Sequence, residues 1–358
     1  MKIEILSKKI ICSCEEGIHN YFAWPSVARL NDGRLAMVAS GYRLGHICPF
    51  GKVIISFSED EGNTWSLPSV VIDTPLDDRD GGITAFGKSN VIVTSFNNSI
   101  EAQREWSKNN KEYGVYINSY LDLVQKKCEW NKYLGSTFRI SHDNGRTFGE
   151  IMRIPITCPH GPVAMPDGSL LYIGRKFSPD DSFQSGEKYL SCYRLFQDGS
   201  YKFLSEIENV GRNFFSCEPH AIVLENNKII VHIRVQNNEG VFTIYQCESY
   251  DGGKQFTIPH KLLSEKGGAP AHIINHNGML ISVYGYRCEP YGIRAMFSRD
   301  EGETWGVDNI ITESEESADL GYPASVALID GRILTVYYTH PDEKKPAVIK
   351  QVIWKYDG

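Results

Sequence analysis

The sequence has no apolar run long enough for a signal peptide at its N-terminus, or for a membrane-spanning segment further along. Its nine cysteines are scattered and show no paired Cys-x2-Cys spacing, which argues against a zinc site or a disulfide framework. Basic residues are fewer than acidic ones, 37 against 44, and the net charge of −7 disfavours a nucleic-acid partner. These absences predict a cytoplasmic protein with neither a membrane nor a nucleic acid as partner.

A Gly-rich phosphate-binding loop is also missing. The pairs Gly81-Gly82 and Gly252-Gly253 occur in turn sequences, without the strand-to-helix context that a dinucleotide or a phosphate loop requires. We therefore expect no cofactor and no metal. Nothing in the sequence indicates an oligomeric state.

The most informative feature that is present is a repeated turn. Its pattern is Ser-x-Asp-x-Gly-x-Thr followed by an aromatic residue, and it occurs at 58–65, 141–148 and 298–305, with a looser copy at 249–256. Aspartate can accept hydrogen bonds from nearby backbone N–H groups, and glycine supplies a positive φ, so each copy predicts a tight turn. Four copies in 358 residues predict a repeat architecture.

A second repeat runs in step with the first. Two β-rich runs flank an Asp-Gly turn, which is a strong hairpin signal, and the figure occurs six times if degenerate turns are included. The turns lie near residues 33, 90, 168, 227, 278 and 331. A four-stranded propeller blade needs about 40–50 residues. The pattern therefore predicts an all-β protein, a six-bladed β-propeller of four-stranded antiparallel blades, with residues 1–358 in one domain.

Two segments fall outside the regular repeat. After the sixth hairpin only one strand-like run remains, at 352–356, so we expect the N-terminal segment, about 1–20, to supply the strand that closes the last blade. The long interval between the second and third hairpins contains an insertion, about 97–132, which is polar and tolerant of helix. It is interpreted either as a solvated surface loop or as a lid over a site.

Charged residues gather at one end of the predicted blades. In a meander blade, residues just before the first strand and just after the second strand meet on the same face near the axis. The residues in those positions include Arg43, His46, Arg79, Asp80, His160, Arg175, Glu218, Arg234, His272, Arg287, Tyr322 and His340. Burying so many ionisable groups is costly unless they pair or hold a ligand, so this face predicts a functional site.

These features resemble the sialidase (neuraminidase) superfamily, whose six-bladed propellers carry Asp-box repeats. The segment Ser216-Cys-Glu218-Pro-His, followed by Ile233-Arg234, is similar to the family segment that carries a Glu and an Arg of the carboxylate-binding triad. The segment Gly321-Tyr322-Pro is similar to the one that carries the nucleophilic Tyr. The resemblance implies that Tyr322 is a nucleophile and that Glu218 is its base.

The chain departs from the family pattern at two points. The first arginine of the triad corresponds to Ala23, and the stretch after the second strand holds no Asp, so that His46 or Asp80 would take the acid/base role. Either Arg43 replaces the missing arm or the substrate is not a sialic acid. The third arginine is Arg287 or Arg294.

The candidate residues divide into two groups. The catalytic candidates are Tyr322, Glu218, Asp80 and His46; the substrate-binding candidates are Arg43, Arg79, His160, Arg234, His272, Arg287 and Arg294. Together with His220, residues His160 and His272 also allow a metal interpretation, but hydrogen bonding to sugar hydroxyls is favoured.

Three functions remain open at this stage. The first is a sialidase-like exo-glycosidase that removes a terminal acidic sugar through a tyrosyl intermediate. The second is a hydrolase or lyase acting on another, uronate-bearing glycan. The third is a non-catalytic carbohydrate-binding propeller. In each case the expected partner is a carbohydrate.

Overall fold

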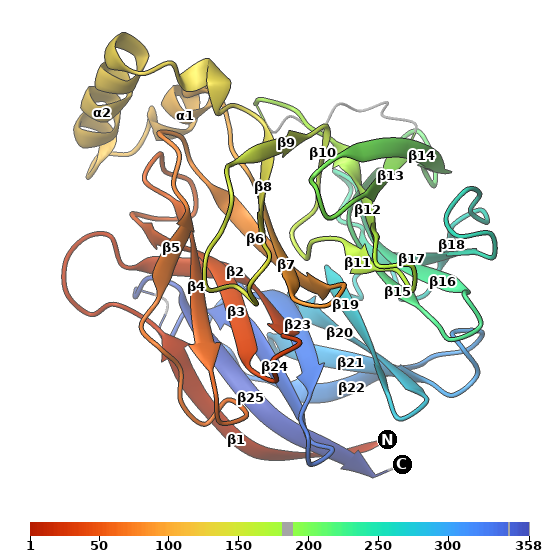
Figure 1. The fold of residues 1–358 in the computed structure, drawn as a ribbon. Helices are drawn as coiled ribbons and strands as arrows, with labels where there is room; N and C mark the ends of the chain where they lie inside the picture. The colour runs from red at the N-terminus through yellow and green to blue at the C-terminus, as the bar shows by residue number, and fades with distance from the viewer. Residues whose placement is uncertain (181–188, 343, 358) are drawn as a thin grey trace.

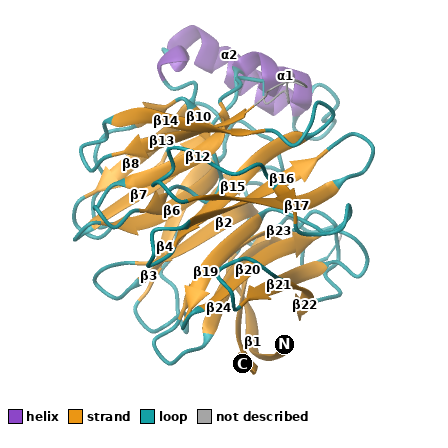
Figure 2. Ribbon diagram, turned by 90° about the vertical axis from the view of Figure 1, so that its right-hand side faces the viewer, coloured by secondary structure: helices purple, strands orange, loops and turns teal. Residues whose placement is uncertain are grey.

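The computed structural model describes residues 1–180, 189–342 and 344–357, and their strands form six sheets around a central axis (Figures 1 and 2). Each sheet is an antiparallel meander in which neighbouring strands follow one another in the chain, apart from one strand supplied by the N-terminus. The predicted six-bladed propeller is therefore confirmed.

Blades 1 to 3 are built from the first half of the chain. Blade 1 contains β2 (Tyr21–Arg29), β3 (Leu35–Arg43), β4 (Lys52–Ser58) and β5 (Ser69–Ile72). Blade 2 contains β6 (Arg79–Phe86), β7 (Asn90–Phe96), β8 (Ser136–Ser141) and β9 (Met152–Ile154). Blade 3 contains β10 (Ile156–Thr157), β11 (Val163–Ala164), β12 (Leu170–Lys176), β13 (Tyr189–Leu195) and β14 (Tyr201–Glu208).

Blades 4 to 6 complete the ring. Blade 4 contains β15 (Phe215–Val223), β16 (Ile229–Gln236), β17 (Phe242–Ser249) and β18 (His260–Lys261). Blade 5 contains β19 (Ala271–His276), β20 (Met279–Tyr286), β21 (Gly292–Ser298) and β22 (Gly306–Thr312). Blade 6 contains β23 (Gly321–Ala327), β24 (Ile333–Thr339), β25 (Val348–Asp357) and β1 (Lys2–Cys12).

Blade 3 departs from the expected four strands because its inner strand is broken. The two pieces, β10 and β11, both pair with β12 and are separated by residues 158–162. This segment contains two prolines, which lack the N–H that a ladder needs, and Gly161 at φ 79°. The break places His160 in a loop on the axis.

The repeated turns hold themselves together and also contact a neighbouring blade. In the first copy, Asp60 accepts hydrogen bonds from the backbone N–H and the hydroxyl of Thr64, each at 2.7 Å. The aromatic residue points outward from the turn: the indole N–H of Trp65 donates to Gln351 of blade 6 at 2.7 Å. Trp305 in the last copy does the same to Gln246 of blade 4, at 2.8 Å. The aromatic residue therefore ties adjacent blades together.

The hydrophobic core is divided among the interfaces between blades. One buried cluster joins blades 6 and 1 and includes Ala23, Trp24 and Tyr322, and similar clusters fill the other interfaces. The strands are apolar on both faces because each face packs against a neighbouring blade. This packing fixes the angles between blades, and hence the positions of the strand ends around the axis.

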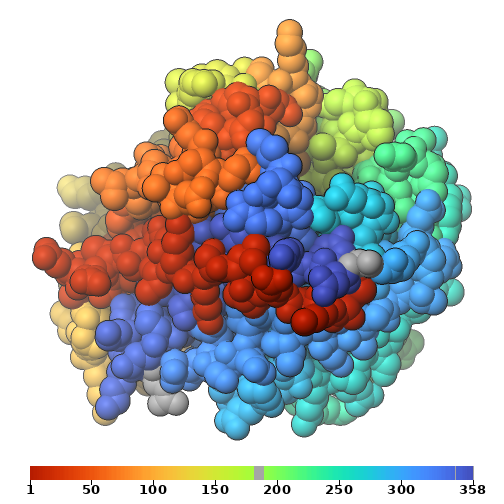
Figure 3. All heavy atoms as spheres, turned by 90° about the horizontal axis from the view of Figure 1, so that it is seen from below, coloured from red at the N-terminus to blue at the C-terminus, as the bar shows by residue number. Residues whose placement is uncertain are grey.

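The N-terminal strand closes the ring, as predicted. β1 pairs antiparallel with β25 and becomes the outermost strand of blade 6. Figure 3 shows the two ends of the chain side by side on the face seen from below. Glu315 lies beneath this closure with a side chain that is 2% exposed. It accepts hydrogen bonds from Lys350 at 2.9 Å, from Tyr337 at 3.0 Å and from Lys8 of β1.

Replacing Glu315 by Gln is expected to lower the free energy of unfolding by about 3 kcal/mol, because two lysines lose a buried counter-charge. Burial alone raises the pKa of Glu315, but hydrogen bonds from Lys8 and Lys350 outweigh it and hold the pKa below its usual value. This stabilisation is therefore present above the carboxyl's unfolded pKa and is lost as the pH falls through the folded one. Urea titration at pH 7 and at pH 3.5 tests the prediction, with the exposed Glu316→Gln as control. Equal losses at both pH values would contradict it.

The insertion, between β7 and β8 of blade 2, is helical and lies at the edge of the propeller (Figures 1 and 2). It contains α1 (Ile100–Ser107), α2 (Gly114–Lys127) and the 3-10 turn η1 (Trp130–Lys132). Its apolar residues pack against Leu44, Phe50 and Leu76, in the loops of blade 1. Within the described residues, no helix is long and apolar enough to cross a membrane.

Candidate active site

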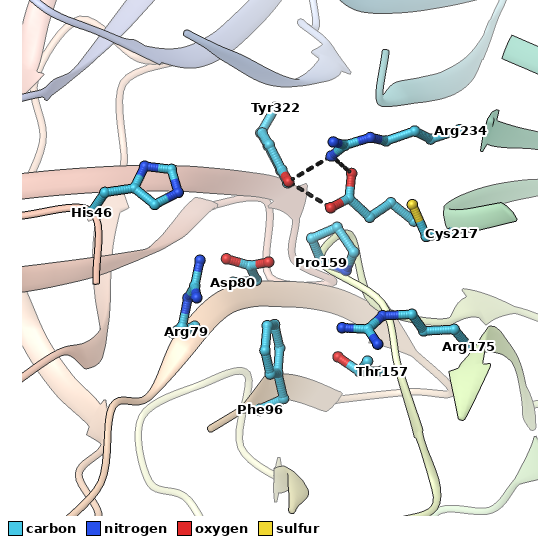
Figure 4. A pocket seen from close by; sticks show the side chains of 11 residues that line it. His46, Arg79, Asp80, Phe96, Thr157, Pro159, Arg175, Cys217, Arg234 and Tyr322 are labelled. Atoms are coloured by element: carbon cyan, nitrogen blue, oxygen red, sulfur yellow. Dashed lines mark hydrogen bonds and ion pairs between the residues drawn. The ribbon is translucent and has the colours of Figure 1, made fainter. Parts of the chain in front are cut away.

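One pocket opens on the axis at the face where the inner strands begin (Figure 4). Its lining combines charged side chains from several blades with a few apolar ones. The lining residues are His46, Arg79, Asp80, Phe96, Thr157, Pro159, Arg175, Cys217, Glu218, Arg234 and Tyr322. Six of the eleven predicted site residues are among them: His46, Arg79, Asp80, Glu218, Arg234 and Tyr322.

The inner strands of four blades share one backbone irregularity. Trp24, Asp80, Glu218 and Tyr322 have φ values of 52°, 49°, 47° and 47°, in the left-handed region that residues other than glycine rarely adopt. Each lies where the register between the first and second strand slips. Such bulges redirect a side chain that regular pleating would place between blades. Three of the four redirected side chains line the pocket.

Tyr322, Glu218 and Arg234 form a compact triad (Figure 4). The Tyr322 hydroxyl donates to Glu218 Oε1 at 2.5 Å, and Arg234 Nη1 donates to Glu218 Oε2 at 2.5 Å and to the Tyr322 oxygen at 3.1 Å. Burial and the Glu218 charge raise the pKa of Tyr322 well above 10. Burial would also raise the pKa of Glu218, but the Arg234 charge and the Tyr322 hydroxyl outweigh it and lower this pKa. The resting pair is thus a neutral phenol beside a carboxylate.

Asp80 is a carboxyl group whose pKa is raised, in contrast to that of Glu218. Burial and the nearby Glu218 charge raise its pKa to about 6, although the Arg79 charge opposes the shift. Its Oδ1 is buried and accepts no hydrogen bond from any residue that the structure describes. Asp80 can therefore be protonated near neutral pH and donate a proton into the pocket.

His46 forms the wall beside Asp80 and belongs to a polar network that the sequence analysis missed. Asp319 accepts hydrogen bonds from Tyr338 at 2.7 Å and from Tyr21 at 3.1 Å, and pairs with His340 at 3.1 Å. His46 Nδ1 lies 3.3 Å from the Tyr21 hydroxyl and 3.5 Å from Asp319 Oδ1. Asp319 lies three residues before Tyr322, just ahead of an inner strand. Asp80 was selected because it lies near the start of an inner strand, so the same criterion could have found Asp319 in the sequence.

The remaining predicted arginines lie outside the pocket lining. Arg287 is beside it, with its guanidinium carbon 5.9 Å from the centre of the Tyr322 ring, and its N–H groups donate to Leu320 O and to the Tyr338 hydroxyl. Arg294 lies on β21, the third strand of blade 5, and stacks on Tyr286 at 4.6 Å. Third strands are further from the axis, so of the two alternatives Arg287 is the one near the site.

The placement of Arg43 also differs from the expectation. Its side chain is fully buried and forms an ion pair with Asp77 at 2.6 Å. It donates to the carbonyls of Gly45 and His46 at 3.2 and 3.0 Å, while Gln103 of α1 donates to Asp77 at 3.3 Å. Arg43 therefore holds the loop that carries His46 and does not point into the pocket.

The insertion likewise supports this loop. Of the described residues, none in 97–135 lines the pocket, so the lid interpretation has no support in this geometry.

The histidines of three successive blades meet on the axis below the pocket. The rings of His220 and His272 stack at 4.1 Å, and His160 contacts both edge-on. They line a separate cavity on the other side, so His160 and His272 are not placed to bind a sugar in the pocket. His220 Nδ1 accepts a backbone N–H, and no group of three or more His, Cys, Asp or Glu in the described part of the chain is arranged to hold a metal.

Several pocket residues were absent from the predicted set. Phe96 ends the second strand of blade 2, and Arg175 is the last residue but one of the second strand of blade 3. Thr157 ends the first piece of the inner strand of blade 3, and Pro159 lies in the break that follows it. The position of Arg175 after a predicted second strand placed it on this face, but it was not among the eleven site candidates. Thr157 and Pro159 had no such signal, because the break in that strand is not evident from the pattern.

Comparison with known proteins supports the fold. No protein-family model and no curated protein matches the chain. Among solved structures, a protein of unknown function from Dyadobacter fermentans has a TM-score of 0.77 and 17% identity, covering 99% of both chains. The NanB sialidase from Streptococcus pneumoniae has a TM-score of 0.68 and 13% identity, covering 97% of this chain and 70% of its own.

A third match is the Trypanosoma rangeli sialidase in complex with 2,3-difluorosialic acid, described as a covalent intermediate. Its TM-score is 0.63 with 15% identity, and it covers 93% of this chain but only 54% of its own. At these identities the likeness concerns the fold. The chain has the six-bladed propeller of the sialidases, as the sequence resemblance predicted.

Proposed function

We propose that this protein is a sialidase-like exo-glycosidase that removes a terminal acidic sugar from a glycan. The observation that carries the proposal is the Tyr322 hydroxyl held 2.5 Å from Glu218, with Arg234 bridging both. A neutral phenol is a poor nucleophile, and a carboxylate at this distance takes its proton as the bond to the sugar forms. The sialidases of similar fold support the reaction class.

In this mechanism Tyr322 attacks the anomeric carbon, Glu218 accepts the phenolic proton, and Asp80 protonates the departing oxygen. Asp80 suits the acid role better than His46. The pKa of its carboxyl group is raised to about 6, so part of it carries a proton near neutral pH. The pKa of His46 is lowered, so at pH 7 the imidazole is neutral and is a poorer proton donor to a leaving group.

An acidic substrate suits the charge of the pocket. The pocket is lined by three arginines, Arg79, Arg175 and Arg234, and by only two carboxyl groups. One of these carboxyl groups, that of Asp80, is partly protonated near neutral pH. Ala23 is buried and Arg43 is paired internally, so neither supplies a third arm for a carboxylate clamp. This favours a second candidate function: a hydrolase or lyase that acts on a uronate-bearing glycan.

To test this, the purified protein is incubated with aryl sialosides and aryl uronides, and release of the phenol is measured. Acidic oligosaccharides are incubated in parallel, and their ultraviolet absorbance is monitored. Aryl release from either class supports the glycosidase. An absorbing unsaturated product without hydrolysis points to a lyase. Tight binding of an acidic sugar that stays intact on long incubation contradicts both enzymes and favours a carbohydrate-binding propeller.

A further inference from the structure

The orientation of the His46 ring follows from the hydrogen bonds around Tyr21. The Tyr21 hydroxyl has one proton, which it donates to Asp319 Oδ2 at 3.1 Å. Its oxygen is then an acceptor for His46 Nδ1, which lies 3.3 Å away. The Asp319 carboxylate, 3.5 Å from the same nitrogen, also favours a proton there. His46 therefore carries its proton on Nδ1, and its Nε2 is an unprotonated acceptor in a ring that lines the pocket.

The groups around His46 keep it neutral. The His46 side chain is 47% exposed, but the protein around the ring removes part of its solvent and lowers its pKa. The charges of Arg79 and Arg43 add to this effect, while Asp319 opposes it. The indole of Trp24 contacts the ring edge-on at 4.9 Å and offers no charge. Arg79 in turn lies 4.9 Å from the Trp24 ring. The pocket thus holds an acid, Asp80, and a separate neutral base, His46 (Figure 4).

We propose that His46 is the base that activates water in the second half of the reaction, and that Asp319, acting through Tyr21, positions it. The proposal rests on the proposed glycosidase function. In many retaining glycosidases one carboxyl group is first the acid and then the base. Here the two roles fall on two residues whose environments favour opposite protonation states.

In the second half of the reaction, water replaces Tyr322 on the sugar. A water molecule donates a hydrogen bond to His46 Nε2, and its oxygen attacks the anomeric carbon of the tyrosyl-linked sugar. The carbon–oxygen bond to Tyr322 breaks, and the water's proton passes to Nε2. Glu218, which took the phenolic proton in the first step, returns it to Tyr322. The imidazolium of His46 then releases its extra proton to Asp80, which restores the acid.

Asp319 is a positioning residue because it does not line the pocket and acts through Tyr21 and His46. Replacing it by Asn removes the charge that favours the Nδ1 proton, and the amide can itself donate to the Tyr21 oxygen. The ring is then free to carry its proton on Nε2, which cannot accept one from water. The variant is expected to lose activity mainly in the second step. Since the two neutral tautomers carry the same number of protons, raising the pH should not restore that activity.

The experiment is rapid-mixing kinetics with an aryl glycoside that has an activated leaving group, using whichever sugar the native protein cleaves. His46→Gln is expected to release about one equivalent of phenol in a burst and then turn over about 100-fold or more slowly than the native protein. Azide, an anionic nucleophile that needs no base, should restore turnover and give a glycosyl azide. Asp319→Asn should show a smaller burst of the same kind. Asp80→Asn should show none, because the base of the second step is intact and breakdown of the intermediate is not slowed.

His260→Gln serves as the matched control, since His260 is exposed on the edge strand β18, remote from the pocket lining. A His46→Gln variant whose burst phase slows as much as its steady state, or that azide does not rescue, overturns the proposal. A burst with azide rescue in Asp80→Asn assigns the base role to Asp80 and also overturns it. In both cases native turnover leaves the glycosidase function standing. Absence of any release by the native protein contradicts the function itself.

Discussion

Replacing Tyr322 by Phe is expected to lower kcat by at least about a thousandfold, while KM changes only a few-fold. The substitution removes the oxygen that forms the bond to the sugar and leaves the ring that packs in the core between blades 6 and 1. Glu218 loses one hydrogen bond but keeps Arg234 as its ion-pair partner. The stability cost should therefore be about 1 kcal/mol.

The matched control is Tyr286→Phe, a half-buried tyrosine at the end of β20 that does not line the pocket. Steady-state kinetics on the aryl glycoside and thermal unfolding of both variants make the comparison. Turnover by Tyr322→Phe within tenfold of the native value would exclude a tyrosyl intermediate and leave the Tyr322–Glu218 pair with a structural role.

The second large effect is expected for Asp80→Asn, which keeps the shape of the side chain but cannot donate an acidic proton. With a poor leaving group, such as the hydroxyl group of a neighbouring sugar, the rate should fall about 100- to 10,000-fold. With an activated phenol the loss should be small, since that group departs without protonation.

The pH dependence supplies an independent test of Asp80. Its pKa is raised to about 6, so the protonated form that serves as the acid is lost as the pH rises through 6. The native rate with a poor leaving group should fall above that pH, and the Asn variant should lack this limb of the profile. An unchanged limb in the variant would assign the acid to another residue.

Much of the fold is predictable because the repeats encode it locally. The Ser-x-Asp-x-Gly turns and the Asp-Gly hairpins mark strand ends, and their number and order predict six blades closed by the N-terminal strand. The rule that residues before the first strand and after the second share a face correctly brings together Asp80, Glu218, Arg234 and Tyr322. It works because the blades are meanders with a common axis.

The rule does not tell which way a side chain points. The bulge at Trp24, Asp80, Glu218 and Tyr322 turns these side chains out of the regular pleat, and no local pattern announces a positive φ at such residues. Arg43, like Arg234, lies near the end of a second strand, yet it is directed into the interior by Asp77, a partner 34 positions away in the chain. His160 depends on a strand break that only the packing of blade 3 reveals.

The helical insertion shows the same limit. Its polar composition predicts a surface segment, and it does lie at the surface. Its apolar residues, however, dock on the loop between β3 and β4, a tertiary contact that composition does not specify. Through Gln103, Asp77 and Arg43 it is connected to the backbone of His46, so it contributes to the site by support and not by coverage.

The most direct test of the central claim is mass spectrometry after incubation with fluorinated acidic sugars that carry an activated leaving group, in sialic and uronic forms. If Tyr322 is the nucleophile, one equivalent of sugar becomes covalently attached and peptide mapping places it on Tyr322, with none on the Phe variant. Turnover of the matching aryl glycoside with an adduct on a different residue, or with no adduct while the probe inactivates the protein, would contradict it.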